Sequence, residues 1–102
     1  MASNLVKAEI TVSGLVQGVG FRYFVYSKAQ ILGINGHTKN LFTGEVVTVV
    51  EGERYLVEEL IDYLKIGPSR SHVKSHSVNW FEYKNEFKIF EIKHWFADCV
   101  LN

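Results

Sequence analysis

Residues 14–22 read Gly14-Leu15-Val16-Gln17-Gly18-Val19-Gly20-Phe21-Arg22. In this stretch the spacing of apolar residues changes from the alternation of a strand to the repeat of a helix. Before it, from Val6 to Val12, apolar and polar residues alternate, which predicts a half-buried strand. After it, apolar residues recur at helical spacing over 21–32, and Gly33 stands where a C-terminal helix cap belongs. The stretch is therefore a strand-to-helix connection, and its two close-set glycines allow a tightly curved backbone.

The same connection has the features of an anion-binding loop. Glycines let neighbouring N–H groups turn toward one point, and the start of a helix adds a positive partial charge. Arg22 supplies a planar fork of donors that matches phosphate or carboxylate. The alternative is a solvent-exposed arginine, although a cation is mildly unfavourable at this end of a helix.

We expect the ligand of this loop to be smaller than a nucleotide. Tyr23 stands where the dinucleotide-binding fingerprint needs a third glycine, and the Gly-Lys-Ser/Thr of a nucleotide P-loop is absent. Phosphate is therefore the leading candidate for the bound anion.

The remaining pattern predicts a ferredoxin-like α/β (α+β) sandwich. Beyond the first strand and helix, we expect strands over 35–42, 45–51, 73–82 and 87–95, a turn at Thr43-Gly44, and a helix over 54–65. A β-α-β-β-α-β order gives one mostly antiparallel sheet with two helices on one face.

Composition and charge restrict the classes of function. We expect residues 1–102 to form a single domain, with a core over about 6–95 and an atypical C-terminal tail over 96–102. Eleven basic and eleven acidic residues cancel, so we expect no nucleic-acid partner. A lone cysteine, Cys99, and the lack of a signal sequence or an apolar span predict a cytoplasmic protein with no membrane partner. Separately, we expect the chain to be a monomer.

Asn40 is the second candidate site residue, at the end of the predicted strand over 35–42. A carboxamide donates and accepts hydrogen bonds, so it could orient a water, but an asparagine at a strand end also supports a turn. His72 and His76 are four positions apart, which is compatible with a pair of metal ligands. No cysteine or carboxylate cluster accompanies them, so we expect no metal site.

Two motifs resemble those of the acylphosphatase family, and the resemblance extends over roughly residues 6–95. The motifs are Val16-Gln17-Gly18-Val19-Gly20-Phe21-Arg22 and Gly36-His37-Thr38-Lys39-Asn40. Shorter matches in spacing stand at Thr43-Gly44-Glu45-Val46, Glu51-Gly52 and Gly67-Pro68. In the second motif His37 and Thr38 depart from the aromatic and aliphatic residues usual there, which bears on the packing around Asn40.

The resemblance implies the ferredoxin-like fold and hydrolysis of acyl phosphates to carboxylate and inorganic phosphate, without a metal or an organic cofactor. It implies that Asn40 positions water for in-line attack and that the substrate phosphate takes up the proton of that water. It also implies that the phosphate is bound by the Arg22 side chain and by the backbone of Val16, Gln17, Gly18, Val19, Gly20, Phe21 and Arg22.

Two other functions stay open at this point. The same order of elements underlies RNA-recognition domains, and Phe42, Tyr83 and Phe87 are available to stack on bases. The neutral charge and the lack of the Lys/Arg-Gly-Phe/Tyr pattern with its trailing aromatics count against that function. A regulatory sensor of phosphate or carbamoyl phosphate would keep the anion-binding loop without turnover.

Overall fold

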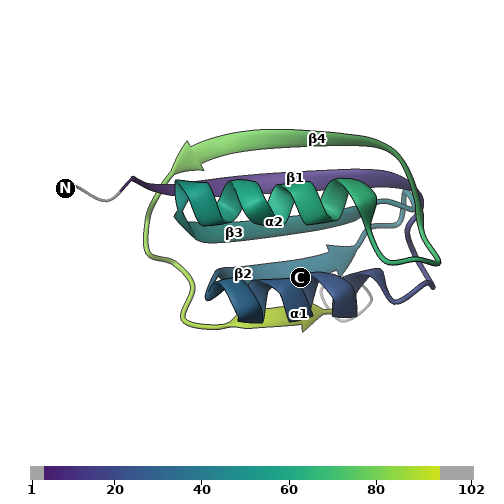
Figure 1. Cartoon of the computed structure of the whole chain (residues 1–102), viewed down its shortest axis with the longest axis horizontal. Coiled ribbons are helices and arrows are strands. Elements are labelled where there is room, and N and C mark those ends of the chain that lie inside the picture. Colours follow the sequence, from purple (N-terminus) through teal and green to yellow (C-terminus); the bar gives the residue numbers. More distant parts are fainter. Residues whose placement is uncertain (1–3, 95–102) are drawn as a thin grey trace.

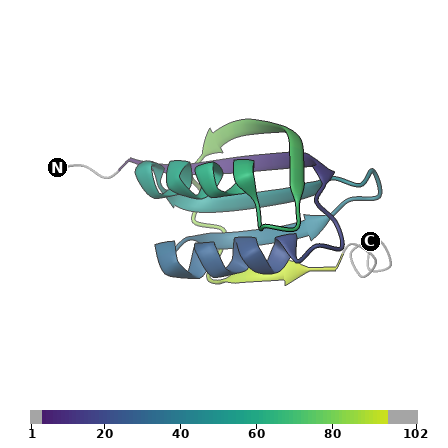
Figure 2. The same ribbon diagram turned by 45° about the vertical axis from the view of Figure 1, so that its right-hand side comes forward.

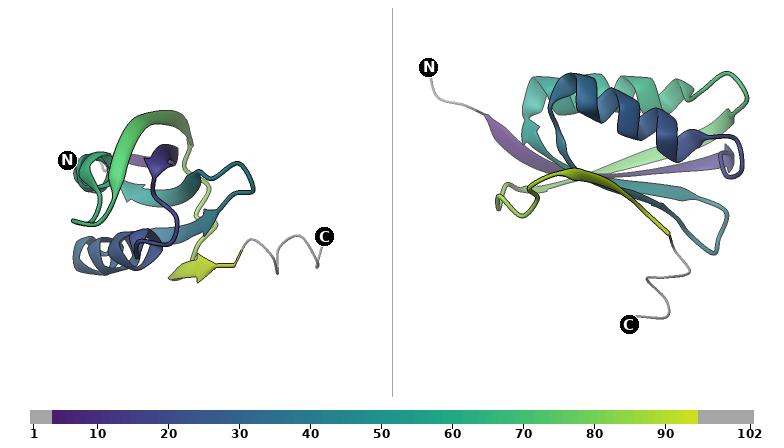
Figure 3. Two further views of the ribbon diagram at one scale, coloured as in Figure 1. Left: turned by 90° about the vertical axis from the view of Figure 1, so that its right-hand side faces the viewer. Right: turned by 90° about the horizontal axis from the view of Figure 1, so that it is seen from below.

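The computed structural model describes residues 4–94, which form a five-stranded sheet with two helices on one of its faces (Figures 1 and 3). The elements are β1 (Leu5–Leu15), α1 (Phe21–Leu32), β2 (Asn35–Asn40), β3 (Val46–Glu53), α2 (Arg54–Ile66), β4 (His72–Glu82) and β5 (Phe90–Lys93). The predicted ferredoxin-like order is confirmed, with β5 following its six elements. The predicted tail over 96–102 lies outside the described residues.

The order of the strands brings two distant segments to one end of the sheet. The order is β4-β1-β3-β2-β5, and all neighbouring pairs are antiparallel except β2 and β5. Since β1 and β2 are both antiparallel to β3, they run in the same direction and end at the same edge (Figures 1 and 2). The loop that follows β1 therefore lies beside the turn that follows β2.

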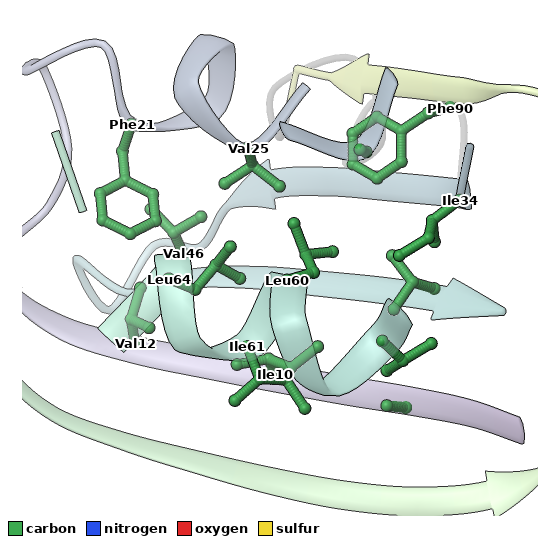
Figure 4. Close-up of a cluster of buried hydrophobic side chains, with 14 of the residues drawn as sticks. Ile10, Val12, Phe21, Val25, Ile34, Val46, Leu60, Ile61, Leu64 and Phe90 are labelled. Carbon is green, nitrogen blue, oxygen red and sulfur yellow. The ribbon is translucent and has the colours of Figure 1, made fainter. Parts of the chain in front are cut away.

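The core fills the space between the helices and the sheet. Figure 4 shows side chains from both helices and from the strands meeting there. On α1 the predicted apolar stripe is buried at Phe21, Val25 and Ala29. Val16 and Phe21, which stand on either side of Gln17–Gly20, are both buried. The core thus fixes both ends of the loop between β1 and α1. No helix within residues 4–94 is long and apolar enough to cross a membrane.

Several strand boundaries differ by one to three residues from those predicted, and two of the differences have a cause that the structure shows. β2 ends at Asn40 and not at residue 42, because the Leu41 N–H donates to the Glu45 carbonyl at 2.8 Å and so begins the turn. β5 begins at Phe90 and not at residue 87, and Phe87 instead packs edge-on against His37, with ring centroids 5.5 Å apart. Strong local patterns located these strands, but contacts across the sheet set their ends.

Thr38, where the second motif usually has an aliphatic residue, is accommodated by a polar pair in the core. Its side chain is fully buried, and its Oγ1 lies 2.9 Å from Oγ1 of Thr48, the residue opposite it on β3. The Thr38 hydroxyl also lies 3.3 Å from the Val47 carbonyl oxygen, to which it donates in that bond. The buried hydroxyls therefore satisfy one another two positions before Asn40.

Glu51 fixes the path of the loop that leads from β4 to β5. Its side chain is 4% exposed, and its two carboxylate oxygens accept the N–H groups of Lys84 and Glu86, each at 2.7 Å. Lys7 forms an ion pair with Glu86, and the hydrogen bond that the Lys7 ammonium donates in it lowers the pKa of the Glu86 carboxyl below its ordinary value. This loop carries the chain from one edge strand to the other, so Glu51 helps to place β5.

The threonine pair predicts a measurable coupling between two strands. Thr48→Val leaves the buried Thr38 hydroxyl with only its longer bond, so the free energy of unfolding should fall by about 1 kcal/mol. In urea denaturation, Thr38→Val together with Thr48→Val should cost less than the sum of the two single changes. Strictly additive losses would show that the two hydroxyls do not stabilise each other.

Candidate active site

The backbone of residues 16–20 leaves the start of α1 open to an external acceptor. Gly18 and Gly20 have φ angles of 74° and 77°, in the left-handed region that glycine adopts without strain. Gly20 is the N-cap of α1, and no side chain within residues 4–94 caps this helix or places an acidic group in its first turn. The first N–H groups of α1 are therefore available to an anion.

A cavity of about 120 Å³ lies at this helix start, and it brings the two main candidate residues together. It is lined by Val16, Gly18, Gly20, Phe21, Arg22, Tyr23 and Asn40. Arg22 and Asn40 come from different elements, α1 and β2, and meet at the edge where β1 and β2 end. The cavity is smaller than the roughly 300–1,000 Å³ of sites for drug-sized ligands, so it fits a small group such as a phosphate.

Five of the seven residues predicted to bind phosphate line the cavity, and Gln17 and Val19 do not. In the sequence, Tyr23 stands out only as the residue that breaks a nucleotide-binding pattern. In the structure Tyr23 lines the cavity, and its side chain is 72% exposed. Its position in the first turn after the glycine loop was the available signal, because every residue of that turn lies near the helix start.

Arg22 is held by a backbone contact from the far end of the chain. Its Nη1 donates to the Lys93 carbonyl oxygen at 2.9 Å, at the end of β5. A guanidinium carries five N–H donors, so one such bond orients the group and leaves it able to bind an anion in a bidentate manner. The residue is half-buried, which restricts the rotamers from which it can reach the cavity.

Asn40 stands at the point where β2 gives way to a tight turn. It is the last residue of β2 and is paired with Val46 at the start of β3. Behind it, the Gly44 N–H donates to the Leu41 carbonyl at 3.1 Å, which confirms the predicted turn at Thr43-Gly44. The backbone of Asn40 is therefore held on both sides, by the sheet and by the turn.

The side chain of Gln17 connects the glycine loop with that turn. Its Nε2 donates to the carbonyl oxygens of Leu41 and Glu45, both at 2.8 Å. From the sequence, only the backbone of Gln17 was a candidate for the site, because no periodicity links residue 17 with residues 41 and 45. Gln17 thus joins the two segments that line the cavity.

His72 and His76 do not face the same side of the sheet. Ser13 pairs with Ser75 and Gly14 with Val73, so Lys74 is the extra residue of a β-bulge and reverses the alternation along β4. His76 faces α2, where it lines a groove with Glu58 and Asp62. Within residues 4–94, no group of three or more His, Cys, Asp or Glu side chains is arranged to hold a metal ion.

The cavity combines three kinds of group that suit a small oxyanion and a water molecule. The uncapped start of α1 and the Arg22 guanidinium supply donors and positive potential, and the Asn40 carboxamide supplies both a donor and an acceptor. No carboxylate or imidazole is among the described residues that line the cavity. The arrangement therefore favours charge stabilisation and positioning over proton transfer by a protein side chain.

A family model, curated relatives and solved structures each match this chain to acylphosphatases. The family model of acylphosphatase matches residues 8–92. The acylphosphatase of Caldanaerobacter subterraneus subsp. tengcongensis is 43% identical over 81% of this chain and 92% of its own length, and that of Methanococcoides burtonii is 45% identical over 84% and 90%. The crystal structure of acylphosphatase from Bacillus subtilis superposes with a TM-score of 0.83 at 33% identity, over 86% of this chain and 98% of that one. The chain therefore belongs to the acylphosphatase family.

Proposed function

We propose that Arg22 and the N–H groups of residues 16–22 bind the phosphate of an acyl phosphate, and that Asn40 positions the water that attacks it. The chain hydrolyses acyl phosphates, as its family does. The observation that carries the assignment of the site is the single small cavity that Arg22 and Asn40 both line. This cavity already brings together the loop, Arg22 and Asn40, which are the groups that the reaction uses, so we propose that a monomer is sufficient for activity.

The binding step depends on local charge, because the chain as a whole is neutral at pH 7. The phosphate oxygens accept bonds from the Arg22 fork and from the N–H groups at the start of α1. Both are fixed before the substrate arrives, Arg22 by the Lys93 carbonyl and the helix start by the buried Phe21. Donors that are already in place stabilise developing charge without the cost of reorganisation.

In the chemical step the oxygen of water attacks phosphorus on the side opposite the acyl oxygen. The bond between phosphorus and that oxygen breaks, and its electron pair leaves with the carboxylate. The proton of the water passes to a phosphate oxygen of the substrate, which agrees with a described lining that holds no carboxylate or imidazole. A carboxylate is a good leaving group, so the main task of the protein is to align the reactants and stabilise charge.

Hydrolysis of benzoyl phosphate in the presence of a metal chelator tests the function as a whole. The wild-type chain should keep its full rate, because the step described above uses only the loop, Arg22 and Asn40. His76→Ala, which alters the groove beside α2, serves as the control and should also keep the rate. Loss of activity on chelation would contradict the metal-free step described above.

Arg22→Ala should weaken transition-state stabilisation by at least about 3 kcal/mol, which lowers kcat/KM more than a hundredfold. The reason is that the guanidinium of Arg22 contacts the charge that develops in the transition state. Arg22→Lys should also be poor, since a point charge does not replace two parallel donors. The matched control is Arg70→Ala, an exposed arginine after α2. Steady-state kinetics on the three variants, with phosphate as a competitive inhibitor, provide the measurement. An Arg22→Ala enzyme that binds phosphate as tightly as wild type would contradict the assignment.

Asn40→Ala should reduce turnover to a small residual rate and leave the inhibition constant of phosphate within about threefold of the wild-type value, because the carboxamide holds the water and the anion-binding loop holds the anion. Asn35→Ala is the matched control: it removes the same side chain from the opposite end of β2. This control should keep the wild-type kcat. Normal turnover in Asn40→Ala would refute the role of Asn40 while leaving that of Arg22 intact.

A further inference from the structure

We propose that Gln17 is a positioning residue that sets the distance between the anion-binding loop and the Asn40 carboxamide. The inference rests on the proposed roles of the loop and of Asn40. The side chain of Gln17 does not line the cavity, so it does not act on the substrate directly. It acts through the turn that follows Asn40.

Gln17 is the only residue between Val16 and Phe21 with a polar side chain, since its companions in the loop are glycine and valine. The loop has no regular secondary structure, and Gly18 and Gly20 are exposed. Burial of Val16 and Phe21 fixes the ends of the loop, but burial alone does not fix its lateral position. Among the side chains of residues 17–20, the Gln17 carboxamide is the one that can connect the loop to a neighbour through hydrogen bonds.

The two carbonyl groups that Gln17 reaches are those that close the turn after β2. The Leu41 carbonyl accepts the Gly44 N–H at 3.1 Å, and the Glu45 carbonyl accepts the Leu41 N–H at 2.8 Å. Each carbonyl also accepts one bond from Gln17 Nε2, both at 2.8 Å. One amide group therefore spans the turn and joins both of its sides to the loop.

This contact acts on Asn40 because Leu41 is its immediate neighbour in the chain. Gln17 is only half-exposed, so water competes weakly for its donors. A displacement of about 1 Å between reacting groups can cost a hundredfold in rate. A bond that holds the loop against residue 41 therefore controls whether the water on Asn40 lies in line with the bound phosphorus.

Gln17→Met tests the proposal, because methionine keeps the length of the side chain and removes both donors. We expect kcat for benzoyl phosphate to fall about tenfold to a hundredfold, with the inhibition constant of phosphate within about threefold of wild type. Gln17→Lys returns donors to the same place and should recover part of kcat. The control is Thr43→Ala, which removes a side-chain bond to Glu45 inside the same turn without touching the loop; it should leave kcat unchanged.

A double-mutant cycle separates this inference from the proposed function. If Gln17 acts through Asn40, Gln17→Met should lower the residual rate of Asn40→Ala by less than twofold. An unchanged kcat in Gln17→Met, or an equal loss in the Asn40→Ala background, would overturn the inference. A fully active Asn40→Ala would instead overturn the role proposed for Asn40, on which the inference rests. Should Gln17→Met fail to fold, Gln17→Lys remains, and a kcat for it below one-hundredth of wild type in a folded protein would also overturn the inference.

Discussion

The parallel course of β1 and β2, on the two sides of β3, is the constraint on which the site depends. Both strands pair antiparallel with β3, so their last residues reach the same edge of the sheet. β1 continues into the anion-binding loop at this edge, and β2 ends there at Asn40. A register that moved either strand by one residue would turn its buried side chains to the other face, so the core itself keeps the two ends aligned.

Several long-range contacts then fix the side chains and loops of the site whose positions the pairing of the strands does not determine. The Lys93 carbonyl orients Arg22, and β5 reaches that position after a loop held by the Glu51 carboxylate. Gln17 joins the loop after β1 to the turn after β2. The preorganised charge of the cavity is local: it comes from one arginine and one helix start in a chain with no net charge. This pattern suits a small anion better than a polyanion.

Much of the fold could be predicted from the sequence because each element has its own period. The change of period at residues 14–22 located the end of β1 and the start of α1, and Gly33 marked the end of that helix, where it caps Ala29 and Gln30 carbonyls. The ends of β2 and β5 could not be predicted, because they depend on a turn bond and on a ring contact between distant residues. The β-bulge at Lys74 separates the two histidines, and no local pattern announces it.

The site was predictable to a smaller extent. Arg22 could be identified as a site residue from its place directly after the glycine loop. An asparagine at a strand end is common, so Asn40 could be identified only through the family resemblance. The roles of Gln17 and Lys93 could not be foreseen, because a side-chain bond to a backbone carbonyl across the fold places no demand on the type of the accepting residue. Contacts of this kind become visible only when the strands are in register.

The most direct test of anion binding at the start of α1 is a titration of the isotope-labelled protein with inorganic phosphate, monitored by the chemical shifts of its N–H groups. If the anion binds in this cavity, the backbone signals of residues 16–23 and the side-chain amide of Asn40 should shift together, with one saturation curve. In Arg22→Ala the dissociation constant for phosphate from this titration should rise by more than tenfold. Shifts concentrated instead in the groove between α2 and β4, or an Arg22→Ala titration equal to that of wild type, would contradict this prediction.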